Sequence, residues 1–141
     1  MTKTIKLIEE KNTYLEKFLG LNREWLGRLA VGDFGDLESF RENRENILNI
    51  VKHIDVLVDT QSQTIDAQDV DTTTRYRLNE LLDHKDLLVK AILTQDLDIM
   101  QFIETAKSQI IIELRNVRQG RKTLSSYKSE KKNSESLDEK A

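Results

Sequence analysis

The apolar residues of this chain recur at intervals of three and four positions along most of its length, and no proline interrupts them. This spacing places apolar side chains on one face of an α-helix. Because a proline inside a helix costs about 3 kcal/mol, its complete absence is typical of long helices. The sequence therefore predicts an all-α fold in which amphipathic helices bury their apolar faces against one another.

Two segments follow one pattern, GDFGDLESFRENRENIL at residues 32–48 and QDLDIMQFIETAKSQII at residues 95–111. Asp33 in the first segment corresponds to Asp96 in the second. In both, an apolar helical run ends, an aspartate follows and a second amphipathic run begins. The pattern predicts two antiparallel helical hairpins, which form a four-helix bundle or an elongated coiled-coil-like bundle.

The expected helices span residues 4–31, 34–59, 72–95 and 97–127, within a single domain of residues 1–127. Four helix ends have an expected cap, because glycine, aspartate and threonine favour these positions. Gly32 ends the first helix, Asp33 and Asp96 begin the second and fourth, and Asp71 or Thr72 begins the third. The polar segment 61–71 is predicted to be a loop with room for one helical turn.

Residues 128–141 read KSEKKNSESLDEKA, which is charged and rich in serine. Such a segment has too little apolar surface to offset the entropy lost on ordering. We therefore predict a disordered polar tail.

Composition excludes several classes of protein. The net charge of −3 argues against a general nucleic-acid binder. No apolar run approaches the roughly 20 residues needed to span a bilayer, and acidic Glu9 and Glu10 interrupt any signal-peptide core. Without cysteine there is no disulfide or thiolate metal site. We expect a cytoplasmic protein without stable membrane insertion.

The sequence also offers no pattern typical of catalysis. It has no nucleophile elbow, P-loop or dinucleotide fingerprint. His53 and His84 are its two histidines, and neither has a glutamate three positions before it, as a di-iron bundle requires. We expect no enzymatic activity, no catalytic residue, no metal site and no cofactor.

The segment 97–127 has more apolar surface than one helix contact needs. Its expected inner stripe is Met100, Ile103, Ala106, Ile110, Leu114, Val117 and Leu124. With Lys107 and Arg121 included, the stripe steps by nearly 3.5 residues, as in a coiled-coil seam. Ile111 and Ile112 point away from that stripe. Either this helix is central and touches two neighbours, or part of its surface is open to a partner helix.

Positive charge accumulates in residues 99–132, which hold eight bases against Glu104, Glu113 and Glu130. The bases there are Lys107, Arg115, Arg118, Arg121, Lys122, Lys128, Lys131 and Lys132. Two interpretations stay open. Cations are favourable at a helix C-terminus because of the macrodipole, and a basic face can also bind an acidic partner.

The segments LAVGDFGDLESFRENRENIL and ILTQDLDIMQFIETAKSQIIIELRNVRQGRKTLSSYKS resemble the flagellar export chaperones of the FlgN and FliT type. The resemblance covers about residues 5–127, although the chain lacks the Asn-rich segment that FlgN proteins often have before the last helix. It implies a bundle of antiparallel hairpins that binds an axial flagellar protein, at the hook–filament junction or filament cap. A helical groove would hold that protein and deliver it to the export gate.

Five residues are the candidate partner-binding residues: Ile111, Ile112, Arg115, Arg118 and Tyr127. Tyr127 matches by position the C-terminal tyrosine of the family, which is implicated in docking to the export gate. The alternative for Tyr127 is an aromatic residue at a fraying helix end. The alternative for the whole chain is a non-enzymatic structural or regulatory coiled-coil protein, which homodimerises through an exposed seam of the fourth helix.

Overall fold

The chain is all-α in a computed structural model that describes the backbone of residues 1–140 and the side chains of residues 1–128. Its elements are α1 (Thr2–Ala30), α2 (Leu37–Ser62), a short 3-10 helix η1 (Ala67–Asp69) and α3 (Thr72–Lys140). The chain divides into two units, Met1–Met100 and the part of α3 from Gln101 onward.

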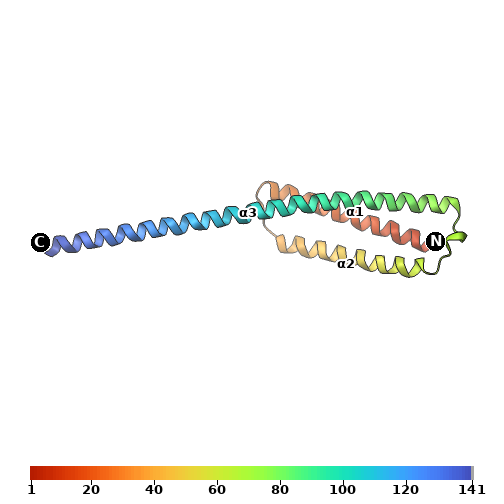
Figure 1. The fold of residues 1–141 in the computed structure, drawn as a ribbon, viewed down its shortest axis with the longest axis horizontal. Coiled ribbons are helices and arrows are strands. Elements are labelled where there is room, and N and C mark those ends of the chain that lie inside the picture. Colours follow the sequence, from red (N-terminus) through yellow and green to blue (C-terminus); the bar gives the residue numbers. More distant parts are fainter. Residues whose placement is uncertain (141) are drawn as a thin grey trace. The chain divides into compact units, whose positions relative to one another are not determined.

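The first unit is a bundle of α1, α2 and the beginning of α3 (Figure 1). Contacts between α1 and α2 show that these helices are antiparallel, since Lys11 pairs with Asp55 near one end and Trp25 stacks on Phe40 near the other. Contacts between α1 and α3 advance together along both helices, from Glu9 with Arg77 to Asn22 with Asp96. Helices α1 and α3 are therefore parallel.

The bundle core consists of the apolar faces that the spacing predicts. Its buried side chains are Ile8, Leu15, Phe18, Trp25 and Leu29 of α1, Phe40, Val51 and Ile54 of α2, and Leu81, Leu88, Ile92 and Ile99 of α3. Phe18 is among the most deeply buried. Leu82 and Val89, apolar residues of α3 next to the buried Leu81 and Leu88, are exposed. Three helices bury only a narrow stripe of each partner, which leaves these flanking leucine and valine side chains in contact with water.

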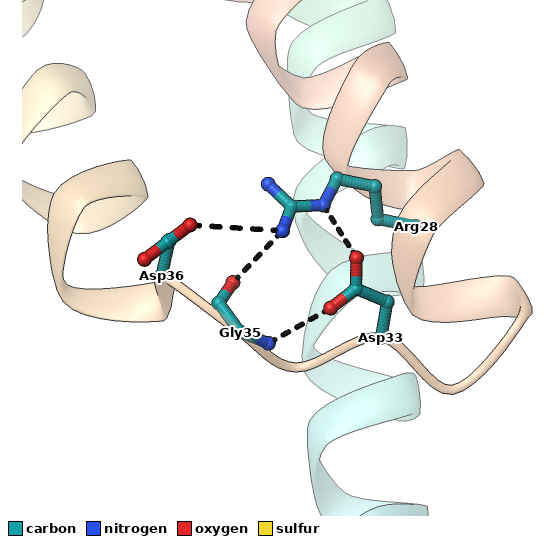
Figure 2. Close-up of polar contacts among 4 residues, drawn as sticks. All are labelled: Arg28, Asp33, Gly35 and Asp36. Atoms are coloured by element: carbon teal, nitrogen blue, oxygen red, sulfur yellow. Dashed lines mark hydrogen bonds and ion pairs between the residues drawn. The ribbon is translucent and has the colours of Figure 1, made fainter.

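Helix α1 ends at a turn that hydrogen bonds hold closely (Figure 2). Gly32 has a φ of +78°, and the backbone N–H groups of Gly32 and Asp33 donate to the carbonyls of Leu29 and Arg28. This is a Schellman motif, which needs a left-handed residue that glycine supplies without a Cβ clash. Gly32 thus lies just beyond the last helical turn.

Side chains add a second layer of bonds to this turn (Figure 2). Arg28 donates from Nε to the Asp33 carboxylate at 2.9 Å and from Nη2 to the carbonyl of Gly35 at 3.2 Å. The other carboxylate oxygen of Asp33 accepts the Gly35 N–H at 3.0 Å. The Arg28 bond, followed by the Gly35 bond, lowers the pKa of Asp33.

The expected role of Asp33 as the N-cap of the second helix is wrong. Helix α2 begins three residues later than predicted, at Leu37, and the residue in the cap position is Asp36. Asp36 has a φ of 60° and makes no side-chain capping bond. Asp33 does not cap α2 because its carboxylate already accepts from Arg28 and Gly35.

The expected third and fourth helices are one helix. Helix α3 runs through Asp96 without interruption, so Asp96 is not an N-cap, and residues 1–140 form three α-helices where four were predicted. No glycine or proline lies between Thr94 and Asp98 to end the helix. The Asp96 carboxylate instead accepts bonds from Asn22 and Arg44 of the neighbouring helices.

At its other end, α3 begins at Thr72, where the Asp71 carboxylate accepts the Thr74 N–H at 2.7 Å. Bonds from Thr74 lower the pKa of Asp71. The backbone of α3 is helical to Lys140, in the segment where the sequence predicted a disordered tail from residue 128. Ala141 lies outside the described residues.

Candidate functional site

Beyond Met100, α3 carries large apolar side chains that are about half exposed. They are Ile110, Ile111, Ile112, Leu114, Val117, Leu124 and Tyr127, with exposed fractions between 49% and 64%. Four of them belong to the stripe that the sequence placed inside a four-helix bundle. That prediction of burial is wrong for these four residues, which are about half exposed and belong to a continuation of α3 in place of a separate fourth helix.

These residues form an ordered pattern on the helix. At about 100° of rotation per residue, Ile103, Ile110, Leu114, Val117 and Leu124 fall within an arc of about 80°. Lys107, Arg121 and Lys128 fall in or beside the same arc and complete alternate steps of three and four residues. We call these eight residues the α3 seam. In heptad notation, its d positions are all apolar (Ile103, Ile110, Val117 and Leu124), and three of its four a positions are basic.

The five candidate residues of the sequence analysis are all exposed, but they do not share one face. Ile111 and Arg118 flank the α3 seam on one side, each about 100° from its centre. Tyr127 flanks it on the other side, and Arg115 and Ile112 lie toward the back of the helix. Partner binding by these residues is untested and remains a prediction.

Sequence reasoning selected Ile111 and Ile112 because the other apolar residues were assigned to the core. The seam residues Ile110, Leu114 and Val117 are the more continuous surface, and the signal for them was present in the 3.5-residue spacing. They were missed because that spacing does not distinguish a helix packed in its own core from one that faces solvent.

The charge near the seam is positive. Lys107 pairs with Glu104 at 3.7 Å, and both side chains are about two-thirds exposed. Among the side chains of residues 1–128, no carboxylate forms an ion pair with Arg115, Arg118 or Arg121. The seam therefore combines apolar side chains with cationic groups that are available to a partner.

A partly buried polar cluster joins the helices of the bundle. Arg44 donates to Asp96 at 2.6 Å, Asn22 donates to the same carboxylate oxygen at 3.3 Å, and Gln95 donates to the carbonyl of Leu19. The Arg44 guanidinium also lies over the Phe18 ring at 4.9 Å. Asp96 is thus occupied by structural partners, and the cluster ties the three helices together.

A pocket of about 390 Å³ lies at the end of the bundle where α1 begins and α2 ends. Its lining is mostly aliphatic and includes Ile8, Val58, Ile65 and Leu78. The Arg75 guanidinium at its edge donates to the carbonyl of Ala67, and the pocket lining contains no acid or histidine. This pocket therefore lacks the groups needed for acid–base catalysis.

The two histidines belong to different helices, His53 to α2 and His84 to α3. His84 lies 3.0 Å from Glu16 on the bundle surface, and His53 is exposed. Within the part of the chain that is described, no three histidine, aspartate or glutamate side chains converge as metal ligands. In the same residues, no helix is both long and apolar enough to cross a bilayer.

Comparison with protein families, curated proteins and solved structures finds no match for this chain.

Proposed function

We propose that this protein is a cytoplasmic flagellar type III export chaperone without enzymatic activity. It would bind an axial export substrate, from the hook–filament junction or the filament cap, and deliver it to the export gate. The observation that supports the proposal is the α3 seam, in which apolar side chains are half exposed along more than three helical turns. A helix with such a surface can hold an amphipathic partner helix.

The resemblance of residues 5–127 to the FlgN and FliT type supports the flagellar part of the proposal. Axial proteins assemble through amphipathic terminal helices, which need cover before export. A reversible contact with a helix suits that task, because apolar burial gives affinity without a covalent step. The half-exposed apolar side chains of α3 between Ile110 and Leu124 would supply the contact surface for that partner.

The test is complex formation between the full chain and purified axial or cap proteins, followed by analytical ultracentrifugation. We expect a stable complex with one of them, and its loss when Ile110 and Val117 are both changed to aspartate. A matched control places aspartate at Val56 and Leu87, which are exposed apolar residues of the bundle. The control variant is expected to bind normally.

Removal of residues 110–127 gives a second check on the site. If the remaining bundle is helical by circular dichroism and still binds the partner, α3 is not the binding surface. If no flagellar axial or cap protein binds the intact chain, the proposed function itself is wrong.

Tyr127 carries a separate part of the proposal, which is docking to the export gate. It lies on the opposite flank of the seam from Ile111 and Arg118, so one helix segment could contact substrate and gate at once. Tyr127→Ala is expected to leave substrate binding intact and to reduce export of the substrate. Equal export by this variant and the unaltered chain would remove Tyr127 from the gate contact.

The alternative function is that of a structural or regulatory coiled-coil protein that homodimerises through the seam. The 3.5-residue spacing of Ile110, Leu114 and Val117 favours it. A mass measurement in solution separates the two proposals. A tight dimer that Ile110→Asp dissociates supports the alternative, whereas a monomer that captures an axial protein supports the chaperone.

A further inference from the structure

The seam has apolar residues at every d position but basic residues at three of its four a positions. These are Lys107, Arg121 and Lys128, and all three side chains are exposed. In a coiled coil, the a and d side chains of one helix pack against those of the other. Whatever covers this seam must therefore accommodate three positive charges along one side of an apolar contact.

A second copy of this chain fits that requirement poorly. A parallel pair would place Lys107 against Lys107 and Arg121 against Arg121, and like charges at such short distances repel. An antiparallel pair would place these bases against apolar d residues such as Ile110 and Leu124. The seam contains no aspartate or glutamate, so neither arrangement gives the bases a carboxylate inside the contact.

From this charge pattern we infer that the partner is a helix of another protein, with aspartate or glutamate at the positions that meet Lys107, Arg121 and Lys128. The inference rests on the proposed function, since it names the chemistry of the helix that the chaperone holds. Apolar residues of that helix, such as leucine, pack against Ile110, Val117 and Leu124, and its carboxylates pair with the bases. The acidic residues select the partner, and the apolar residues supply most of the affinity.

The intramolecular pair between Lys107 and Glu104 does not prevent this pairing. The two groups lie 3.7 Å apart and both are about two-thirds exposed. Such exposed pairs are weak, because water solvates both groups and long side chains lose entropy on pairing. Arg118, which lies on the same flank of the seam as Ile111, adds a further positive charge at the edge of the contact. A carboxylate of the partner helix can therefore replace Glu104 as the ion-pair partner of Lys107 with little loss of free energy.

The experiment uses three synthetic helical peptides of about four heptads, with leucine at d and a single residue type at a. The a residue is glutamate in one peptide, glutamine in the second and lysine in the third. Binding to the full-length chain is measured by fluorescence anisotropy at about 0.15 M and about 0.5 M salt. We expect the glutamate peptide to bind about tenfold more tightly than the glutamine peptide, with the difference shrinking at high salt.

Charge reversal supplies the decisive variant. Lys107→Glu combined with Arg121→Glu is expected to invert the order, so that the lysine peptide binds best. Lys52→Glu combined with Lys90→Glu changes the net charge equally at two exposed lysines of the bundle and is expected to keep the original order. Circular dichroism on both variants checks that the helices are retained.

Several results would overturn the inference. Equal binding of the glutamate and glutamine peptides would show that the bases do not select the partner, although the seam would still bind helices. Binding of none of the three peptides would overturn it as well, while capture of an axial protein by the same chain would leave the proposed function standing. A tight homodimer that the Lys107→Glu and Arg121→Glu changes do not weaken would identify a second copy as the occupant.

Discussion

Residues 28–37 and residues 91–100 occupy equivalent places in the repeated pattern, but the first region is a turn between α1 and α2 and the second lies inside α3. Asp33 and Asp96 correspond, and each accepts a bond from an arginine. The difference arises from their neighbours. Gly32 of the turn corresponds to Gln95, and Gly35 corresponds to Asp98. Only the first region has residues that favour leaving the helical conformation.

An arginine and aromatic rings stabilise the first region further. Trp25 and Phe40 stack with ring centroids 4.6 Å apart, and the Arg28 guanidinium lies 4.2 Å from the centre of the Trp25 ring. Arg28 therefore contacts both the aromatic pair and the turn, where it donates hydrogen bonds to Asp33 and Gly35. The corresponding residues of the second region are Leu88 and Ala91, which cannot form this arrangement. An aspartate alone therefore does not end a helix.

The largest expected effect comes from giving the second region the glycines of the first. Gln95→Gly with Asp98→Gly places two glycines inside α3, at about 1 kcal/mol each, and removes the bond from Gln95 to the carbonyl of Leu19. We expect the free energy of unfolding to fall by about 3 kcal/mol. Urea denaturation measures the loss, and amide hydrogen exchange shows whether residues 93–99 have opened.

The control for this variant is Gln95→Ala with Asp98→Ala, which removes the same side chains but favours the helix. It should lose only the Gln95 bond, about 1 kcal/mol. Equal destabilisation by the glycine and alanine variants would show that helix propensity does not distinguish the two regions.

The second prediction removes the arginine partner in each region. Asp96→Ala leaves the Arg44 guanidinium, whose side chain is 23% exposed, without its ion pair and leaves the Asn22 amide without an acceptor. We expect a loss of about 2 kcal/mol in the free energy of unfolding. Asp33→Ala is expected to cost less, because Arg28 and Asp33 lie at the surface.

Asp98→Ala is the matched control for Asp96→Ala, since Asp98 is an exposed acid two positions further along the same helix. It should change stability by less than about 0.5 kcal/mol. A larger effect for Asp98 than for Asp96 would mean that the cluster around Arg44 does not join the helices. Thermal denaturation of the three variants decides the order.

The first two helices, their buried faces and the loop before α3 follow closely from spacing and composition. Ile8, Phe18 and Trp25 recur at helical intervals, and that periodicity is a local property of the sequence. Helix ends depend on contacts that the local sequence does not reveal. The Asp33 carboxylate does not cap α2 because it accepts bonds from Arg28 and Gly35. The Asp96 carboxylate does not begin a helix and accepts bonds from Asn22 and Arg44.

The surface of α3 was harder to predict for a related reason. Ile110, Leu114 and Val117 have the spacing of a core stripe, and the sequence alone does not say what lies opposite them. In the structure α3 continues through Asp96 without the predicted turn, and the same residues are exposed. The error in one helix boundary thus changed the assignment of a complete face.

The third prediction tests why α1 ends where it does. Gly32 has positive φ with open space around its Cα, so Gly32→Ala should cost about 1 kcal/mol through backbone strain alone. Gly27 also has open space but lies within α1, so Gly27→Ala should stabilise the protein by about 0.5–1 kcal/mol. Opposite signs for two identical substitutions, measured by urea denaturation, are the expected result. Matching signs would contradict the assignment of Gly32 as the left-handed residue.

The smallest expected effect is on the pH dependence of the protein's stability. Bonds from Arg28 and Gly35 lower the pKa of Asp33 in the folded protein below its ordinary value of 3.8. The charged carboxylate therefore stabilises the fold fully above that value, and the contribution is lost as the pH falls through the lower, folded pKa.

Asp33→Asn keeps an acceptor for the Gly35 N–H but has no carboxylate to protonate. Its urea midpoint should lie below that of the unaltered chain at neutral pH, with the gap closing as the pH falls below 3.8 and through the lower, folded pKa. Asp71→Asn is expected to behave in the same direction, because the N–H and hydroxyl of Thr74 lower the pKa of Asp71. A gap that persists unchanged in acid would mean that the turn is held by its backbone bonds and glycines, with no contribution from the ion pair.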